Sequence, residues 1–453
     1  MAILAPTKDL AGSLHDHFTH LAHQGGVDQQ GGPDWLRDLR LHALARFVEL
    51  GWPTRKLEDW KYTALTVLGG LPLLPVMAAT AAPIESLTTV LFPFIDPVGL
   101  RIVLVDGFFV PELSHLDALP DGLVVRSLAA VLAEQPELVR STLAQHADYV
   151  GSAMVALNTA DLQDGVVIHV AKDTVIKAPL YIVSLTTGAT LAQPRILVVT
   201  DRHSELTLVE SHVALGEAPS LSNGVTEIVV GDNAVVEHYK LTSDKTEARH
   251  VATIQTHQLA HSRYVSHAVS LGGSLVRNDL LVTLAAEGST CTLNGLYVGA
   301  HNSRLDTRSV IDHAKPHCTS VELYKGILDG HAVGTFSGKV IVRPQAQKTD
   351  ANQRNNNLLL SQDAVANTKP QLEIDADDVK CAHGATVGQI DADALFYLQS
   401  RGIDAAEARG LMTVAFAGEV SDQFTLLPLR EELNQWLFAH LTHQAATMDK
   451  EAL

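Results

Sequence analysis

Cysteine is scarce in this chain of 453 residues. It has three cysteines, an odd number, so the sequence contains no disulfide framework. The chain also lacks an N-terminal basic and apolar signal segment, and it has no apolar run of about 18 residues. We therefore expect a protein of a reducing compartment, the cytoplasm, with no membrane association.

Clusters of lysine and arginine are missing as well. The formal net charge is -18, whereas binders of nucleic acids or anionic membranes need a basic patch. We predict neither kind of partner. Hydrophobic residues make up 46% of the chain, which is enough for a large core and excludes wholesale disorder.

Common signatures of enzymes are absent too. The chain has no Walker A motif, no GxGxxG and no GxSxG, and no two carboxylates are paired by their spacing. These absences argue against a catalytic role for the chain by itself.

Short runs of β-forming residues fill the chain from about residue 165 to 385, and no convincing helix of ten residues interrupts them. Strand starts after polar turns recur at steps of 27 to 29 residues: Leu206, Val235, Tyr264, Cys291 and Cys318. A near-constant step predicts a solenoid in which each coil stacks on the next. A β-sandwich is the competing architecture, although this array is long for one.

In this register Cys291 and Cys318 begin neighbouring coils. Stacked strands lie about 4.8 Å apart, so the two thiols would occupy equivalent places and lie close together. Buried free cysteines usually serve as small apolar core residues. A redox or transfer role for the pair is the alternative.

Helical patterns flank the strand array on both sides. Residues 34–50 predict a helix with Asp34 as its N-cap and Gly51 as its stop. Residues 127–147 return to helical spacing. We predict three regions: a mostly helical N-terminal region with a short hairpin, a β-helix core and a C-terminal helical region, at 1–161, 162–388 and 389–453.

Within the N-terminal region, residues 1–33 are expected to be a mobile extension. Residues 100–110 are typical of a hairpin with an Asp-Gly turn. A charged run at 53–63 is expected to be a solvated loop that Trp60 and Tyr62 anchor to the body.

Cys381 and His383 are two soft ligands that lie close together in the sequence. In an extended segment, residues i and i+2 face the same side, roughly 6 to 7 Å apart at the backbone. Thiolate and imidazole suit zinc, copper or iron–sulfur centres. Such centres usually need four protein ligands, so this pair is half a metal site at most, and the rest must come from a partner or from distant histidines. A plain strand end and a Cys–His nucleophile dyad are the alternatives, the dyad being disfavoured because i,i+2 side chains run parallel.

Three stretches around this pair closely resemble the signature of the SufB/SufD family, and two N-terminal stretches resemble its SufD branch. The stretches that resemble the family signature are KPQLEIDADDVKCAHGATVG at 369–388, LFYLQSRGI at 395–403 and QRNNNLLLS at 353–361. The stretches that resemble the SufD branch are RKLEDWKYT at 55–63 and ALNTA at 156–160. The resemblance covers the chain from about residue 35 to 440.

This resemblance implies a right-handed parallel β-helix with helical ends, in a non-catalytic scaffold subunit for iron–sulfur cluster assembly. It implies a heterodimer with SufB and contact with the ATPase SufC through the C-terminal helices at 404–418 and 429–441. A homodimer is the alternative for the isolated chain. It further implies that His383, and with weaker support Cys381, contributes to a transient cluster at the SufB interface, with no cluster held tightly by this chain alone.

Two other functions stay open at this point. A SufB-like paralogue is the nearer alternative. A carbohydrate-active β-helix enzyme is the other, although it would favour secretion and a groove of carboxylates.

Overall fold

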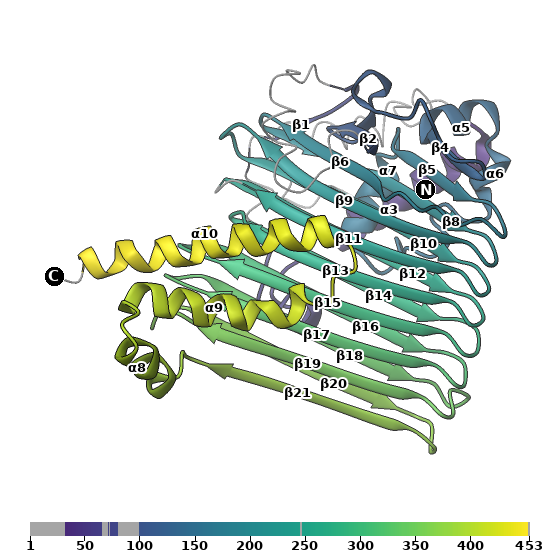
Figure 1. The fold of residues 1–453 in the computed structure, drawn as a ribbon. Coiled ribbons are helices and arrows are strands. Elements are labelled where there is room, and N and C mark those ends of the chain that lie inside the picture. Colours follow the sequence, from purple (N-terminus) through teal and green to yellow (C-terminus); the bar gives the residue numbers. More distant parts are fainter. Residues whose placement is uncertain (1–31, 66–70, 72, 80–98, 245–246, 452–453) are drawn as a thin grey trace.

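Two β-sheets face each other along most of the chain (Figure 1). The computed structural model describes residues 32–65, 71, 73–79, 99–244 and 247–451. Sheet A has 11 strands, with β1 (Leu74–Pro75) and β7 (Thr190–Ala192) beside a main path: β20 (Val365–Ile374), β18 (Val333–Val342), β16 (Arg304–His313), β14 (Leu275–Leu284), β12 (Ala248–Gln258), β10 (Ser220–Val230), β8 (Arg195–Thr200), β5 (Val166–Val170) and β4 (Leu123–Ser127).

Sheet B has 10 strands. Their order is β21 (Lys380–Gly388), β19 (Asp350–Leu359), β17 (Thr319–Leu328), β15 (Thr290–Gly299), β13 (Arg263–Gly272), β11 (Val235–Asp244), β9 (Glu205–Leu215), β6 (Leu180–Thr187), β2 (Leu100–Val105) and β3 (Phe108–Phe109). From β8 onward, successive strands of the coils alternate between the two sheets, so each coil contributes one strand to each.

The strands from β8 and β9 onward pair in parallel and in register. Val235 pairs with Arg263, Arg263 with Thr290, and Thr290 with Thr319, which gives steps of 28, 27 and 29 residues. Between residues 165 and 385, the described part of the chain contains no helix. The predicted parallel β-helix core is therefore confirmed, and the β-sandwich alternative is wrong.

The predicted equivalence of Cys291 and Cys318 is wrong by two residues. Cys291 pairs with Ser320, whereas Cys318 lies in the turn before β17, where Thr319 N donates to the carbonyl of Ser289. The coil between the two cysteines is two residues longer than the one before it, as the steps of 27 and 29 residues show. Both cysteines are buried, but they occupy different positions within their coils: Cys291 lies in strand β15, and Cys318 lies in the turn before β17.

The space between the two sheets forms the main core. Alternate residues of each strand point inward, as the pleat requires, and apolar side chains such as Leu208, Leu293, Leu280 and Phe336 pack together from both sheets. An inward-facing residue therefore lies above and below its equivalents in neighbouring coils. We call such a stack of register partners a column.

Helices of the N-terminal region cover the outer face of sheet A over its first coils. They are α3 (Asp34–Leu50), α5 (Leu128–Glu134), α6 (Glu137–Arg140) and α7 (Ala153–Ala160), with the short 3₁₀ turn η1 (Glu58–Trp60). Phe47 and Leu157 pack there against Leu221 and Val251 of the sheet. Burial of these apolar faces, more than helix propensity, stabilises such short helices. A second 3₁₀ turn, η3 (Pro111–Leu113), lies instead beside β2 of sheet B, where Leu113 packs.

The predicted helix at 34–50 is confirmed, but its N-cap is Pro33, and Asp34 lies in the first turn. The predicted hairpin is also confirmed, since β2 and β3 are antiparallel around Asp106 and Gly107. The segment 127–147 forms two short helices, because Pro136 lies between α5 and α6 and cannot donate a backbone hydrogen bond. Of the predicted mobile extension, all but residues 32 and 33 lies outside the described residues.

A buried ion pair joins this N-terminal layer to the solenoid. Arg195 on β8 and Glu227 on β10 are both fully buried and in direct contact. Arg195 also donates to Asn158 Oδ1 and Thr159 Oγ1 of α7. Glu227 accepts backbone N–H groups of the loop before α7, from Ala144, His146 and Ala147. The ALNTA stretch is thus a docking point between the two layers.

The charged run at 53–63 is held to the outer face of sheet A. Trp60 is buried, with its ring 3.6 Å from the guanidinium carbon of Arg277. Asp59 pairs with Arg308 at 2.9 Å, and Glu58 pairs with Lys369. Trp60 is therefore the anchor, as predicted, whereas Tyr62 is only half-buried.

Three helices follow the last strand, α8 (Ala392–Ser400), α9 (Ala405–Ser421) and α10 (Leu427–Glu451). Asp391 and Asp404 cap the first two, each accepting backbone N–H groups of the first turn. In Figure 1, α9 and α10 lie across the outer face of sheet B, where Leu433 and Leu437 pack against Leu241 and other side chains of the sheet. Among the described residues, no helix combines the length and apolar composition that crossing a membrane requires.

Candidate functional site

The two sheets end together at β20 and β21, which we call the open end. β20 pairs only with β18, and β21 only with β19, so within the described residues neither strand has a partner on its outer side. Every residue of β21 is exposed except Cys381, which is half-buried. Pro370 lies within β20, which suits an edge strand because proline lacks the N–H group that an inner position needs. The open end thus presents two unpaired edges.

Both predicted donors lie on the last coil and on one side of it. β21 is extended, and it places Cys381 over Ala351 and His383 over Gln353. Ala351 and Gln353 are inward-facing and completely buried. Cys381 and His383 therefore continue inward-facing columns of the solenoid, but they are accessible because no coil of the described chain lies beyond them.

The column beneath His383 is polar near the open end. It passes through Gln353, Glu322, Leu293 and Ser266. The column beneath Cys381 passes through Ala351 and Ser320 to Cys291. It is thus Cys291, and not Cys318, that shares a column with the exposed cysteine, at a depth of three coils.

The thiol of Cys381 is held in its neutral form. Burial raises the pKa of this thiol above its usual value, the charge of Asp350 raises it further, and the backbone N–H of Ala351 opposes the rise. A neutral thiol is a poor nucleophile, which weighs against the Cys–His dyad. As expected for a neighbour on the strand, the side chain of Lys380 is exposed.

The donors of this chain do not complete a metal site. In the part of the chain that the structure describes, no three His, Cys, Asp or Glu residues are grouped to hold a metal ion. Cys381 and His383 supply two ligands of suitable type, whereas zinc and iron–sulfur centres usually take four. The residues present therefore fit a shared site better than a resident cofactor.

A buried carboxyl group lies two coils beneath His383. Burial raises the pKa of Glu322 to about 7. Gln353 donates from Nε2 to Glu322 Oε2 at 2.6 Å. This residue was not found from the sequence, because its neighbours on the strand are ordinary β-forming residues.

Glu322→Gln is expected to stabilise the protein at alkaline pH. The folded state keeps the proton up to about pH 7, whereas the unfolded chain releases it near pH 4.5. Between these values the folded state binds more protons, so the free energy of unfolding falls as the pH rises. The variant should gain about 3 kcal/mol at about pH 8, the equivalent of this pKa difference, and little at about pH 5.

Urea unfolding at both pH values measures this gain. Glu217→Gln, an exposed change in a turn, is the matched control and should alter stability at neither pH. A Glu322→Gln variant that gains equally at both pH values would contradict the assignment.

A second polar cluster lies deeper inside the solenoid. Glu210 accepts hydrogen bonds from His212 and His238, and Lys240 donates to His250 Nε2 at 2.8 Å. Burial alone would raise the pKa of Glu210, but the two histidines and the charge of Lys240 lower it well below its usual value. Burial and Lys240 also lower the pKa of His212 to about 4. These residues recur at i,i+2 in successive strands, which is the signal that could have found them.

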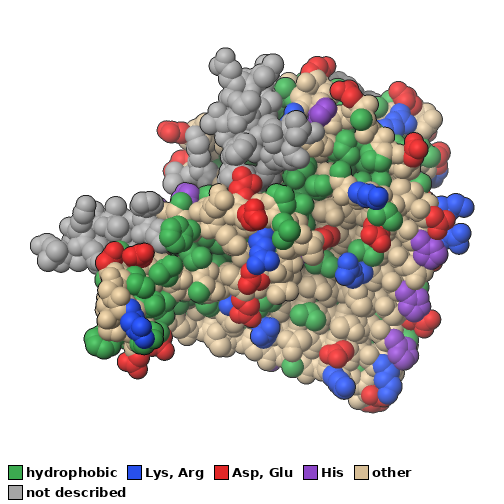
Figure 2. All heavy atoms as spheres, in the orientation of Figure 1, with side chains coloured by type: hydrophobic (Ala, Val, Ile, Leu, Met, Phe, Trp, Pro, Cys, Tyr) green, Lys and Arg blue, Asp and Glu red, His purple; other side chains and the backbone are tan. Residues whose placement is uncertain are grey.

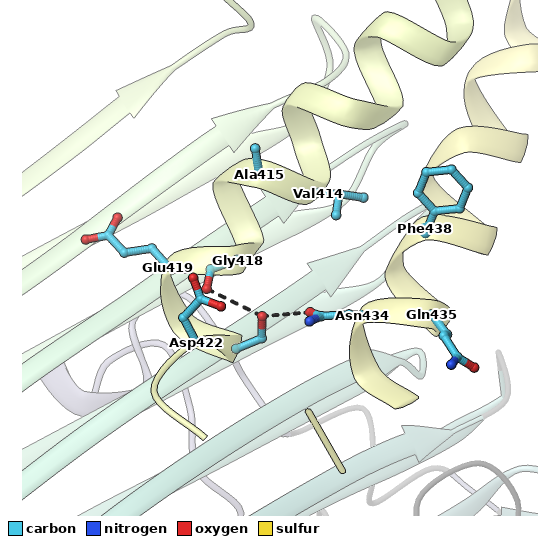
Figure 3. Close-up of a pocket in the computed structure, with 9 residues that line it drawn as sticks. Val414, Ala415, Gly418, Glu419, Asp422, Asn434, Gln435 and Phe438 are labelled. Atoms are coloured by element: carbon cyan, nitrogen blue, oxygen red, sulfur yellow. Dashed lines mark hydrogen bonds between the residues drawn. The ribbon is translucent and has the colours of Figure 1, made fainter. Parts of the chain in front are cut away.

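The C-terminal helices form an open groove between them. It has a volume of about 890 Å³ and lies between α9 and α10 (Figure 3). Val414 and Ala415 lie on its α9 side and Phe438 on its α10 side, while Ser421 donates to Asn434 at its floor at 2.7 Å. Figure 2 shows hydrophobic side chains gathered on this face around the C-terminal helices. The exposed apolar side chains of these helices include Phe396, Tyr397 and Phe438.

Comparison with known proteins bears directly on the open end and on the solenoid. The family model "SUF system FeS cluster assembly, SufBD core domain" matches residues 183–416, and that of the SufBD protein N-terminal region matches residues 96–182. The chain belongs to the SufBD family. The core match includes β21 and both of its donors, and it ends within α9.

Relatives of this SufBD chain extend over most of its length. An iron–sulfur cluster assembly SufBD family protein of Synechocystis is 36% identical over 419 residues, which cover 90% of this chain and 89% of the relative. The iron–sulfur cluster assembly protein SufD of Escherichia coli is 33% identical over 406 residues, covering 88% and 90%. SufD of Bacillus subtilis is 25% identical over 416 residues, covering 88% and 93%. This chain is therefore an iron–sulfur cluster assembly protein of the SufBD family.

The family matches divide the chain at 182/183, within β6. The three regions drawn from the sequence, with boundaries at 161/162 and 388/389, stay a prediction.

Proposed function

We propose that this chain is a SufD-type scaffold subunit that pairs with SufB through its open end. In this proposal a nascent iron–sulfur cluster is the cargo of the interface, and His383 and Cys381 are this chain's ligands to it. One observation carries the proposal. The two donors lie side by side on the inward-facing side of the last coil, where neither sheet has a further strand among the residues that the structure describes.

The edges of the open end support strand addition by a partner. Unpaired N–H and C=O groups on an exposed edge invite another strand. Apolar side chains are exposed on these edge strands at Val365, Ile374 and Val387, and Phe396 of the following helix α8 is 70% exposed. Contact with SufB would cover these groups, and a second copy of this chain is the alternative occupant when SufB is absent.

The cluster chemistry of this proposal needs the partner. Two ligands from β21 leave the remaining coordination positions to SufB, so cluster formation and pairing would depend on each other. The chain would have no catalytic activity of its own, and ATP hydrolysis would belong to SufC. A cytoplasmic location stays a prediction.

The outer surface of α9 and α10 is the proposed contact for SufC. Leu433 and Leu437 face sheet B and are completely buried, so these two residues of the predicted contact at 429–441 serve the chain's own core. The groove beside Phe438 remains available on the other side (Figure 3). Deleting the C-terminal helices would uncover sheet B, so point changes in this groove are the better probe.

His383→Ala tests the proposed cluster site. With SufB and SufC present, we expect the variant complex to load iron and acid-labile sulfide at least about 10-fold less well, since losing a group that holds a metal ligand in place already costs 10- to 100-fold in affinity. His331→Ala, at an exposed turn, is the control and should load normally. Normal loading by a correctly assembled His383→Ala complex would refute the proposed role.

The two alternatives fare differently. The names of the Escherichia coli and Bacillus subtilis relatives favour a SufD-type over a SufB-type subunit. Membership of the SufBD family leaves the carbohydrate-active enzyme without support.

A further inference from the structure

Gln353 has an unused hydrogen-bond acceptor directly beneath the open end. Its side chain is completely buried, and its amide Oε1 is buried with no hydrogen-bond partner in the described part of the chain. Leaving a buried acceptor unpaired costs free energy, so an orphan of this kind calls for an explanation. One side of Gln353 adjoins Glu322, and the other adjoins His383.

The orientation of the Gln353 amide is fixed from two directions. Its Nε2 donates to Glu322 Oε2 at 2.6 Å. Across the interior, the amide lies against Gly338 of sheet A, where an added Cβ would come within 2.3 Å of Nε2. The hydrogen bond to Glu322 and the close packing against Gly338 fix the position of Nε2. The amide oxygen Oε1 is therefore the atom that remains available to accept a hydrogen bond.

His383 is the donor that matches this oxygen. The two residues are register partners on parallel strands and face the same side, and strands in a sheet lie about 4.8 Å apart. A neutral imidazole has one N–H donor and one free nitrogen lone pair. A histidine that binds a metal through one nitrogen almost always donates the other N–H to a carboxylate or carbonyl oxygen.

We propose that Gln353 is a positioning residue for His383. In the proposed arrangement the imidazole of His383 turns toward this free oxygen and donates a ring N–H to it. The other ring nitrogen then keeps its lone pair for the cluster, and Glu322 holds the amide in this orientation. This assignment rests on the proposed role of His383 as a cluster ligand. It also gives the QRNNNLLLS stretch a function, since its first residue would order the ligand one coil above.

The first readout is the ring N–H proton of His383 in the full-length chain without partners. A solvent-exposed imidazole exchanges this proton too fast to be seen, whereas a hydrogen bond to a buried oxygen protects it. We expect a ring ¹H–¹⁵N signal in histidine-labelled protein that is absent from His383→Gln and from Gln353→Met. Asn352→Met, an outward-facing change on the same strand, is the matched control and should keep the signal.

The second readout is iron and sulfide loading of the complex with SufB and SufC. We expect Gln353→Met to load about 10-fold less well, as is typical when the partner of a metal-binding histidine is lost. The double variant Glu322→Gln with Gln353→Glu exchanges amide and carboxylate, so it keeps both the internal hydrogen bond and an acceptor for His383. It should recover the signal and most of the loading.

Three results would overturn the inference: no such signal in the wild-type chain, a signal that Gln353→Met leaves unchanged, or full loading by Gln353→Met after the signal is lost. Failure of the proposed function is distinguishable, because it appears as normal loading by His383→Ala, whatever the state of the ring proton.

Discussion

An Ala385→Pro variant is expected to bind SufB about 100-fold more weakly than the wild-type chain, the equivalent of losing two to three ladder hydrogen bonds at about 1 kcal/mol each. Lys380 N donates to the carbonyl of Thr349, the residue directly before β19. Backbone groups alternate along a strand, so Ala385 directs its N–H toward the unpaired edge. Proline removes this donor, and its ring obstructs the approach of a partner strand.

The solenoid itself should tolerate this proline. Pro370 already occupies β20, the corresponding edge strand of sheet A, and proline suits an extended backbone at an edge. Ala385→Val is the matched control, because it adds a β-branched side chain but keeps the N–H group. Titration calorimetry with purified SufB measures the affinities, and unfolding curves verify the fold. Equal binding by Ala385→Pro and wild-type chains would contradict pairing through β21.

Glu227→Ala is expected to lower the free energy of unfolding by about 3 to 5 kcal/mol, the usual effect of removing one partner of a buried ion pair. The change leaves Arg195 buried without its carboxylate. It also leaves the backbone N–H groups of Ala144 and Ala147 without the oxygens that they contact. The N-terminal layer would thereby lose its main polar connection to the solenoid.

A double variant of Arg195 and Glu227 distinguishes the cost of an isolated buried charge from the cost of lost hydrogen bonds. Replacing Arg195 and Glu227 together by methionine removes both charges, so we expect a smaller loss than in Glu227→Ala, because well-packed apolar residues often substitute for a buried pair. Urea unfolding of the single and double variants measures the difference. A double variant less stable than the single one would show that the hydrogen bonds to α7, and not the isolated charge, dominate.

The repeating strands were predictable because turn residues separate them at a nearly constant spacing along the sequence. The length of each coil was not, since a turn accommodates one or two extra residues without changing the pattern of strand residues. This is why Cys291 was aligned with Cys318 and not with Ser320. That Cys381 and His383 share one side of β21 was predictable from the two-residue period alone, whereas the direction of that side, toward the interior, was not.

What covers an apolar face was beyond the reach of the sequence. The helical spacing of Leu433 and Leu437 shows a face that must be buried, but not whether sheet B or another protein buries it. The interior carboxyl of Glu322 was missed for a related reason: a single strand does not reveal that Gln353 and His383 stand above it in later coils.

The last coil has one neighbour, whereas every inner coil has two. The stability of a stacked-repeat protein is approximately a sum of terms for each repeat and for each contact between adjacent repeats. The strands of the last coil, β20 and β21, therefore fray more readily than the strands of inner coils. A partner strand would supply the missing contact and suppress this fraying. The ligands of the open end would then be immobilised by the same encounter that completes their coordination, so that cluster assembly in the absence of the partner would be disfavoured by geometry and by local disorder alike.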